Sequence, residues 1–369
     1  MNDKIKIFVD CHVFDHGYQG TRTYIEGLYR EMIKLNPNME FYFAACDVKN
    51  LKQCFGTPEN VVYLKYRTKS KFLRLLFDAP RLISQSKIDY AHFQYIVPPF
   101  KRCKYIVTIH DVLFIDFKEY FSFKNRLINT ILYYISSKVS DIVLTVSNYS
   151  KERIQTHFNI HKIAVTPNAV SEEFFLDLDK EEIKKELLKK YKLDKYIIYV
   201  SRWELRKNQE LLLNSFIHLK LYQDYKLVFI GDVSTRNENF DTIYNKLPNQ
   251  IKEKICFLKK TSHSDLVKLV QGAKVSVYPS KAEGFGIPVL ESVAAKVPTL
   301  ISNKTAMSDF DFLSEYSFDP YNQKEFDELL IKTINSYEKI DLTALMETCR
   351  KRYSWKFAAK ILSNKITDF

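Results

Sequence analysis

Short apolar runs alternate with amphipathic stretches along the whole chain. Seven of these runs are mostly apolar and do not alternate regularly, which is typical of strands buried on both faces: residues 5–9, 40–44, 105–109, 142–146, 196–200, 226–230 and 275–278. Helical patterns lie between them, at residues 23–35, 124–139, 208–219 and 264–271. This alternation predicts the α/β fold class, with parallel sheets covered on both faces by helices.

The alternation restarts near Tyr196, after a charged helical segment at 180–191. A chain of 369 residues also exceeds the usual size of one hydrophobic core. We therefore expect two doubly wound, Rossmann-like domains, one over residues 1–170 and one over residues 171–353.

The composition is that of an ordinary folded protein, with 46% hydrophobic and 27% charged residues. The longest apolar stretch, 127–135, is far shorter than the ~20 residues that span a bilayer. The charged N-terminus leads into a strand, not into the apolar core of a signal peptide. Six scattered cysteines without Cys-x-x-Cys spacing disfavour zinc sites and disulfides. We expect a cytoplasmic protein with reduced thiols.

Positive charge is concentrated in the first half of the chain. The net charge is +12, and residues 1–170 hold 24 of the 56 basic but only 15 of the 44 acidic residues. Segment 65–87 carries seven basic residues and one acid, interleaved with apolar side chains. If helical from about Ser70, it would place an apolar stripe beside a basic one and could dock on an anionic membrane. The alternative is an ordinary helix that packs on the sheet. The basic segments lack an aromatic motif for stacking on bases, which argues against nucleic-acid binding.

A glycine-containing turn has the pattern of an anion site. Gly284, Phe285 and Gly286 follow the strand at 275–278 and precede a helix opened by Pro288. Helix amino termini attract anions through free N–H groups and the helix dipole, and open α/β sheets bind ligands at the carboxyl ends of their strands. This turn is therefore a candidate site for a phosphate group.

Two carboxylates, Glu283 and Glu291, bracket that turn. Carboxylates accept hydrogen bonds from sugar and ribose hydroxyls, so the pair is suited to a sugar ligand. The alternative is a helix start stabilised by acids near its amino terminus.

A basic turn follows the strand at 196–200. Arg202, Arg206 and Lys207 stand between this strand and the next helix. Arginine binds phosphate oxygens in bidentate fashion and lysine supplies a point charge, so the turn could neutralise a diphosphate without a metal ion. A solvated basic turn is the alternative.

His110 closes the strand at 105–109 and is followed by Asp111. A lone histidine at a strand end is more often structural, and Asp111 could orient its ring or cap the next turn. Gly17 and Gly20 lie between the first strand and the first helix, but they do not form the Gly-x-Gly-x-x-Gly fingerprint, and the chain has no Walker A sequence. This argues against NAD and P-loop ATP chemistry.

Taken in order, these motifs resemble those of the retaining GT-B glycosyltransferases of family 4, also called group 1. The resemblance is carried by YVSRWELRKNQELLLNSF (199–216) and YPSKAEGFGIPVLESVAAKVP (278–298), with shorter matches at VTIHD, LTVSNYS and VTPNAV. It covers nearly the whole chain. Ser201 stands where the family usually has glycine, and the segment 303–313 lacks the usual Pro–Glu pair.

The resemblance implies roles for particular residues. Donor diphosphate binding would fall to Arg202, Lys207, Gly20, Thr21, Phe285 and Gly286. Donor ribose and sugar binding would fall to Glu291, Glu283 and Gly284. His110 and Glu283 would be the catalytic residues. The last helix, 354–369, would cross back onto the first domain.

The resemblance also implies the fold and the activity. The GT-B fold has two Rossmann-like domains facing across a cleft. The reaction would transfer a hexose from a nucleoside-diphosphate sugar, with retained configuration and with no metal ion or other cofactor. The TIHDVLF region is similar to polysaccharide mannosyltransferases, which favours GDP-mannose over a UDP-linked donor. The acceptor would be a saccharide or a lipid-linked saccharide, used for surface polysaccharide such as lipopolysaccharide or capsule at the inner face of the membrane.

Two other functions fit the same architecture. One is a sugar-nucleotide epimerase, which would act on the donor alone. The other is a non-catalytic subunit that binds nucleotide sugars, although the complete set of charged residues argues against it. A phosphorylase would need a lysine placed for pyridoxal phosphate, and no segment suggests one.

Overall fold

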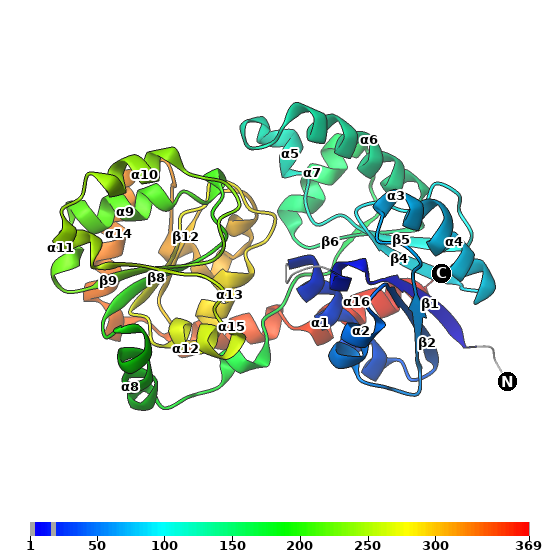
Figure 1. Ribbon diagram of the computed structural model, residues 1–369, viewed down its shortest axis with the longest axis horizontal. Helices are drawn as coiled ribbons and strands as arrows, with labels where there is room; N and C mark the ends of the chain where they lie inside the picture. Colours follow the sequence, from blue (N-terminus) through cyan, green and yellow to red (C-terminus); the bar gives the residue numbers. More distant parts are fainter. Residues whose placement is uncertain (1–3, 16–19, 369) are drawn as a thin grey trace. The chain divides into compact units, whose positions relative to one another are not determined.

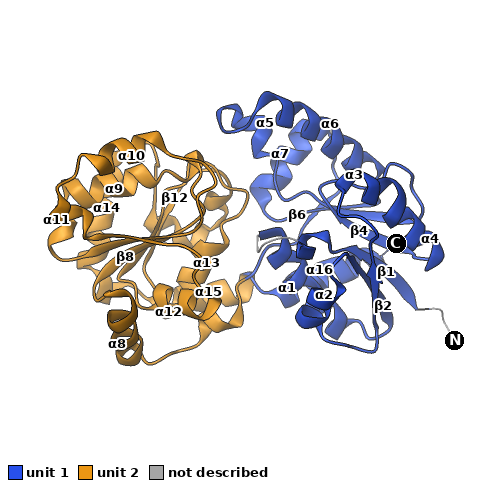
Figure 2. Cartoon of the chain, viewed as in Figure 1, with its two compact units in different colours: residues 1–169, 353–369 blue, residues 170–352 orange. Residues whose placement is uncertain are grey.

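The structure is a computed structural model that describes residues 4–15 and 20–368. The chain divides into two compact units (Figure 2). Unit 1 comprises residues 1–169 and 353–369, and unit 2 comprises residues 170–352. These boundaries lie one residue before those expected from the alternation of strands and helices.

Unit 1 is built on a seven-stranded sheet in the order β3-β2-β1-β4-β5-β6-β7, and its described strands all pair in parallel (Figure 1). The strands are β1 (Ile5–Asp10), β2 (Met39–Ala45), β3 (Val61–Lys65), β4 (Tyr90–Gln94), β5 (Lys104–Thr108), β6 (Ile142–Thr145) and β7 (Ile163–Val165). Central strands such as β5 and β6 are buried at all but one of their positions. This explains their apolar runs, since both faces of a parallel sheet are covered by helices.

The main helices of unit 1 are α1 (Gly20–Leu35), α2 (Val48–Phe55), α4 (Ala79–Gln85), α6 (Phe123–Val139), α7 (Asn148–Phe158) and α16 (Trp355–Thr367). Side chains from α4, α6 and α7 share one hydrophobic cluster with the sheet, including Leu82, Leu132 and Phe158. These three helices therefore cover the same side of the sheet.

The last helix, α16, packs on α1 of the same unit. A Cβ atom added at Gly27 of α1 would lie 2.1 Å from Cε2 of Trp355, so the indole needs a glycine at this position. At the other end of α16, the hydroxyl of Tyr90 donates a hydrogen bond to the carbonyl oxygen of Ile366 (3.2 Å). The C-terminal segment thus completes the first unit, although it follows the second in sequence.

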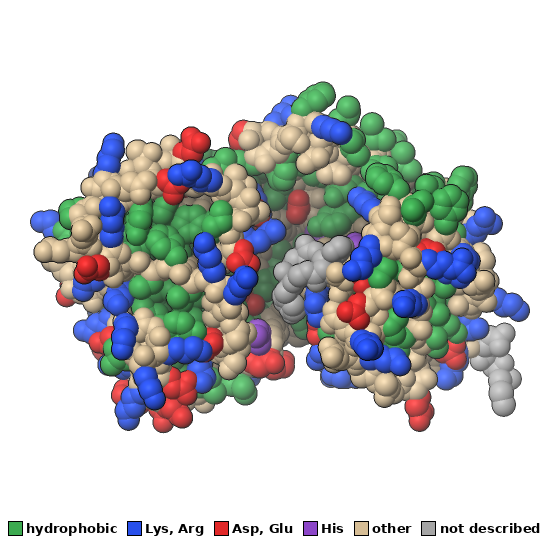
Figure 3. All heavy atoms as spheres, in the orientation of Figure 1, with side chains coloured by type: hydrophobic (Ala, Val, Ile, Leu, Met, Phe, Trp, Pro, Cys, Tyr) green, Lys and Arg blue, Asp and Glu red, His purple; other side chains and the backbone are tan. Residues whose placement is uncertain are grey.

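Helix α6 departs from the usual pattern. An amphipathic helix normally turns its apolar stripe toward the core, but many apolar residues of α6 are exposed, as the hydrophobic surface near α6 shows (Figure 3). Leu132 and Tyr133 pack on the hydrophobic cluster, and the fully buried residues of the helix are Ser136 and Ser137. The connection between β4 and β5 approaches the helix at these small residues, where the Val97 N–H donates to Oγ of Ser136 (3.2 Å).

Segment 65–87 becomes helical immediately after Ser70, as expected, but it is not one regular helix. It contains α3 (Lys71–Leu73), a π-helix η2 (Arg74–Asp78) and then α4. Phe72, Leu73, Leu76 and Phe77 are exposed, whereas Leu75 is buried. None of the described helices is both long enough and apolar enough to cross a membrane.

Unit 2 has a six-stranded parallel sheet in the order β10-β9-β8-β11-β12-β13. Its strands are β8 (Tyr196–Val200), β9 (Lys226–Ile230), β10 (Ile255–Leu258), β11 (Val275–Tyr278), β12 (Thr299–Ser302) and β13 (Ser317–Phe318). Its helices are α8 (Lys180–Tyr191), α9 (Gln209–His218), α10 (Glu238–Asn245), α11 (Asn249–Lys252), α12 (His263–Gln271), α13 (Ile287–Ala294), α14 (Gln323–Asn335) and α15 (Leu342–Arg352). Helices α10 and α14 pack on α9, while α12 and α15 pack on α13.

Candidate active site

The predicted donor residues of unit 2 follow the carboxyl ends of neighbouring strands. Strands β9, β8 and β11 lie side by side and run parallel, so the loops that follow them meet at one edge of the sheet. Gly231, after β9, has φ +140°, and a Cβ atom there would lie 2.1 Å from the carbonyl oxygen of Ser201. Gly231 thus allows the β9 loop to lie directly against the start of the basic turn.

The carboxylate of Glu283 accepts hydrogen bonds from several side chains at this edge of the sheet. Oε2 accepts a hydrogen bond from Nη1 of Arg206 (2.8 Å), and Oε1 accepts from Oγ of Ser280 (2.9 Å) and from Nζ of Lys207. Its backbone N–H donates to Oγ1 of Thr305 (2.9 Å). Glu283 is buried, yet both carboxylate oxygens have partners.

The charges of this cluster support one another. Burial by itself would raise the pKa of Glu283, but Lys207 and Arg206 outweigh it and lower the pKa to about 2. Burial lowers the pKa of the Lys207 ammonium, and Glu283 counteracts that effect. With all three groups ionised, two cations surround one anion, but Glu204 also pairs with Arg206. Arg202, which pairs with Glu204 as well, brings the count to three cations and two anions. The basic turn therefore keeps one net positive charge that can attract a phosphate group.

The turn that carries Arg206 and Lys207 is fixed by backbone contacts. It is a 3-10 turn, η5 (Leu205–Lys207), and ends at Asn208 in the left-handed region with φ +58°. The Asn208 side-chain amide donates to the carbonyl oxygens of Pro279 (3.1 Å) and Pro320 (2.9 Å). The hydroxyl of Tyr199 donates to the Lys207 carbonyl oxygen (2.7 Å). These bonds hold the basic turn against the loop that carries Glu283.

Arg202 lies at the outer end of the same network. Its side chain is 61% exposed and its Nη2 is 3.0 Å from Oε1 of Glu204. The other oxygen of Glu204 is 2.6 Å from Nη2 of Arg206. Arg202 is therefore linked to Glu283 only through Glu204 and Arg206. Arg206, which the motif resemblance left out of the diphosphate site, makes the direct contact.

Helix α13 begins at the predicted turn. Gly286 caps it with φ +118°, a conformation that favours glycine, and Pro288 lies in its first turn. Phe285 is buried edge-on against Phe310, with ring centroids 5.6 Å apart. The glycines and the proline thus form the helix start that the sequence predicted, beside Gly284 and the Glu283 cluster.

Glu291 stands apart from the ion cluster. It is half-buried in α13, and burial raises its pKa to about 7. No ion pair to Glu291 occurs among the residues that the structure describes. This carboxyl group therefore changes its protonation near neutral pH, when no ligand is present.

In unit 1, His110 follows β5 and is buried. Its Nε2 is 2.6 Å from Oε1 of Gln94. The rings of Tyr24 and Tyr95 lie against it, with centroids at 5.0 and 5.1 Å. Burial lowers the pKa of His110 to about 3, so the imidazole is neutral at physiological pH. Because an amide oxygen only accepts, Nε2 carries the proton and Nδ1 is left as an acceptor.

Two neighbours of His110 have contacts that bear on its position. The Asp111 carboxylate accepts a hydrogen bond from the backbone N–H of Leu113 (3.1 Å). Gln94, which holds Nε2 of His110, lies with its own Nε2 3.4 Å from Nε2 of His92. Gln94 was not predicted, because nothing in its sequence position marks it as functional.

Gly20 and Thr21 form the first residues of α1. Gly20 is exposed, and a Cβ atom there would meet nothing within 4 Å. Gly17 lies outside the described residues. Among the described residues, packing does not require a glycine at position 20.

Across residues 4–15 and 20–368, no group of three or more His, Cys, Asp or Glu side chains is arranged to hold a metal ion.

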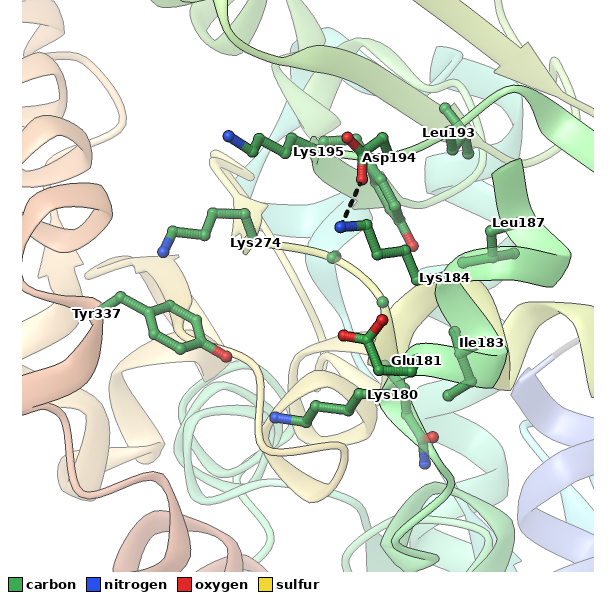
Figure 4. A pocket seen from close by; sticks show the side chains of 14 residues that line it. Lys180, Glu181, Ile183, Lys184, Leu187, Leu193, Asp194, Lys195, Lys274 and Tyr337 are labelled. Carbon is green, nitrogen blue, oxygen red and sulfur yellow. Dashed lines mark ion pairs between the residues drawn. The ribbon is translucent and has the colours of Figure 1, made fainter. Parts of the chain in front are cut away.

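A pocket of about 220 Å³ in unit 2 lies at the amino ends of β8 and β11, next to Lys195 and Lys274 (Figure 4). It is lined by lysines of α8 and by Tyr337, and by none of the predicted donor residues.

Comparisons with known proteins identify the family. Residues 18–174 match the family model Glycosyltransferase Family 4, and residues 179–348 match the model Glycosyl transferases group 1. The O-antigen chain mannosyltransferase B of Escherichia coli is 26% identical over 306 residues, which are 77% of this chain and 79% of that protein. The O-antigen chain mannosyltransferase RfbU of Salmonella typhimurium is 29% identical over 53% of this chain, and the match spans about half of the relative's own length (51%).

Solved structures share the fold. A glycosyltransferase of Rickettsia africae superposes with a TM-score of 0.72 at 18% identity, covering 99% of this chain and 98% of that chain. The HepE protein of Anabaena, solved with UDP and glucose, has a TM-score of 0.72 at 13% identity, covering 99% of this chain and 100% of that chain. The expected GT-B architecture of two Rossmann-like units is confirmed. With one family model on each unit, the chain belongs to the group 1, family 4 glycosyltransferases.

Proposed function

We propose that this protein transfers a hexose, mannose in the first instance, from a nucleoside-diphosphate sugar to a saccharide acceptor. The observation that carries the proposal is the cluster of Arg206, Lys207 and Glu283 beside the start of α13. The printed names of the relatives, which are mannosyltransferases of O-antigen chains, support mannose and surface polysaccharide. GDP-mannose is the preferred donor in this proposal, and a UDP-linked sugar is the alternative.

The cluster supplies what a departing diphosphate needs. The three basic residues of the turn carry three positive charges against the two negative charges of Glu204 and Glu283. Helix α13 adds N–H groups and the positive end of its dipole. Arg202 is exposed and free to swing toward a ligand when its surface pair with Glu204 opens. These groups stabilise developing negative charge without a metal ion, in the way that preorganised donors act in oxyanion holes.

In unit 1, we propose that Nδ1 of His110 accepts a hydrogen bond from a hydroxyl of the transferred sugar. Gln94 holds the imidazole in the tautomer that makes this possible. Glu291 would accept hydrogen bonds from the donor ribose, which favour its ionised form.

Retention of configuration belongs to the same proposal and rests on the family resemblance. The bond from the anomeric carbon to the diphosphate oxygen breaks, and a bond to the acceptor oxygen forms on the same face of the sugar. The acceptor's proton passes to the leaving phosphate oxygen. The diphosphate therefore serves as the base, and the protein positions it.

The direct test is a panel of nucleotide sugars assayed by thermal shift and then by product analysis. A ligand that binds only the folded protein raises its melting temperature in proportion to ln(1 + [L]/Kd). We expect GDP-mannose to give the largest shift and to be consumed only when a saccharide acceptor is present. Conversion of donor alone to an epimer would show the epimerase, and binding without any turnover would show a non-catalytic subunit.

We further propose a cytoplasmic protein that touches the inner face of an anionic membrane through segment 65–87, where it would meet a lipid-linked acceptor. The exposed apolar residues of this segment, with the basic residues around them, support this contact.

A further inference from the structure

The outward face of α6 is apolar along its length. Phe123, Leu127, Ile131 and Ile135 repeat every four residues and are between 46% and 73% exposed. Residues four apart lie on one face of a helix, and these twelve steps span about 18 Å at 1.5 Å per residue. Ile128 and Tyr134 flank the stripe and are also exposed. A stripe of this length is unlike the scattered apolar residues of ordinary protein surfaces.

A second set of apolar side chains comes from α3 and the π-helix. Phe72 and Leu76 are exposed, whereas the Arg74 side chain between them is buried and lies 3.4 Å from Oδ2 of Asp10. This inward ion pair fixes the π-helix, and the wider turn places Leu75 inside with Arg74. The two apolar residues before Arg74 and the two after Leu75 therefore stay exposed; they are Phe72, Leu73, Leu76 and Phe77.

These two sets lie on the same side of the unit 1 sheet. Helix α4, which continues the π-helix, and α6 both pack on the hydrophobic cluster that includes Leu82 and Tyr133. Phe100, on the connection between β4 and β5, is exposed as well. We call the exposed apolar residues of α6 and of segment 72–77, together with Phe100, the apolar platform. Hydrophobic side chains gather over these elements in Figure 3.

Basic residues outnumber acidic ones around the apolar platform, although Lys101 is paired with Asp141 (2.8 Å). Segments 65–77, 98–104 and 123–139 each contain at least three lysines or arginines and no aspartate or glutamate. Lys124 and Lys138 are exposed on α6 itself, near its two ends. An apolar stripe with basic residues at its borders is the pattern of a helix that lies in the interface of an anionic bilayer.

We propose that the apolar platform is a membrane-docking surface, on which α6 lies flat in the headgroup region of a bilayer that contains anionic lipids. This deepens the proposed membrane contact by making α6, not segment 65–87 alone, the main inserting element. A second copy of the chain fits less well as the occupant. Pairing of two such faces about a two-fold axis would bring together borders in which basic residues outnumber acidic ones.

The platform is also connected with the candidate site. Tyr133, on the inner side of α6, stacks on Tyr95 with ring centroids 5.2 Å apart. Tyr95 in turn lies 5.1 Å from the ring of His110. Docking through α6 would therefore bring the surroundings of His110 close to lipid-linked molecules.

Vesicle sedimentation with the full chain tests this surface. The protein should pellet with vesicles of phosphatidylcholine and phosphatidylglycerol, and not with phosphatidylcholine alone. The Leu127→Ser/Ile131→Ser double variant should lose about tenfold or more in partitioning. Leu188→Ser in α8 is a matched control, because Leu188 is 48% exposed on unit 2 and should bind as the wild type does. Equal binding by the double variant and the wild type would overturn the proposal.

Two further measurements identify the occupant. A Leu127→Trp variant should be quenched by lipids brominated on their acyl chains, whereas Val62→Trp, at another exposed apolar position of unit 1, should not. If the wild type is a dimer that the double variant converts to monomers, and neither binds vesicles, the surface is a self-association face and the proposal is wrong.

The double variant should transfer sugar to a water-soluble acceptor at the wild-type rate. A wild type that binds vesicles but transfers no sugar would refute the proposed reaction and leave docking intact.

Discussion

Nη1 of Arg206 lies 2.8 Å from Oε2 of Glu283, although the two residues are 77 positions apart in sequence. Lys207 contacts the other oxygen of the same carboxylate. In a chain without bound donor, Glu283 thus holds both cations at the carboxyl edge of the unit 2 sheet. One family 4 motif places an acid before Gly-Phe-Gly, and another places a basic pair after the first strand of this unit. The contacts between them give both motifs a physical reason, because each stabilises the charge of the other.

Glu291 gives a prediction about pH. Its pKa is raised from 4.5 to about 7 by burial, so the folded protein binds this proton more tightly than the unfolded chain does. The corresponding stability is present below about pH 4.5 and is lost as the pH rises through 7. We expect Glu291→Gln to unfold at the same temperature as wild type at the acidic end and at a higher temperature above pH 7. Thermal unfolding across this range measures the effect, and parallel curves at every pH would contradict it.

His110 gives a prediction about turnover. His110→Ala should remain folded, with a strongly reduced kcat, because the ring contacts the substrate in this account. Because the pKa of His110 is about 3, the pH profile of the wild-type kcat should show no inflection from this residue near the ordinary histidine pKa of 6.5. Kinetics and circular dichroism of the same preparations check both points. A collapsed melting temperature with unchanged turnover per folded molecule would make His110 a structural residue.

The periodicity of the chain predicts much of the fold but not the orientation of every helix. Strands β8, β9 and β11 have the bounds that their apolar runs indicate. Strand β4 was missed because its sequence, YAHFQ, includes two polar residues, His92 and Gln94, that are buried through hydrogen bonds. Helix α6 has nearly the expected extent, but its exposed apolar stripe was not predicted, because periodicity shows that a helix has an apolar stripe and does not show whether the stripe is covered.

The candidate site was predictable to a similar degree. Strand ends and motifs identify Glu283, Lys207 and His110, since ligands bind at the carboxyl ends of parallel strands. The partners Ser280, Thr305 and Gln94 carry no local signal, because their roles depend on contacts between distant loops. Arg206 was visible in the basic turn, but only the structure separates its buried contact from the exposed position of Arg202.

Metal removal provides a further prediction. In this account the positive charge that a leaving diphosphate requires comes from Lys207, Arg206 and the α13 amino terminus. Sugar transfer should therefore continue after dialysis against EDTA. A loss of activity that manganese or magnesium restores would show that the charge is supplied by a metal ion.

The contact between α1 and α16 predicts the effect of a single methyl group. Gly27→Ala would place a Cβ atom 2.1 Å from the Trp355 ring and force the last helix to shift. We expect a loss of about 1–3 kcal/mol in the free energy of unfolding, as for other overpacked sites. Gly20→Ala is the matched control, because no atom lies within 4 Å of its added Cβ. Denaturant unfolding compares the two, and an unchanged midpoint for Gly27→Ala would refute the packing argument.

The central claim is that Lys207 helps to bind and stabilise a donor diphosphate. Its most direct test compares Lys207→Ala with Lys281→Ala, a nearby lysine whose Nζ lies 3.4 Å from Glu210 instead of Glu283. Loss of one preorganised donor should remove about 2–4 kcal/mol of transition-state stabilisation, which is roughly a 30- to 900-fold fall in kcat/KM for sugar transfer. Lys281→Ala should stay close to wild type. Near-normal kcat/KM in a folded Lys207→Ala protein would contradict the account.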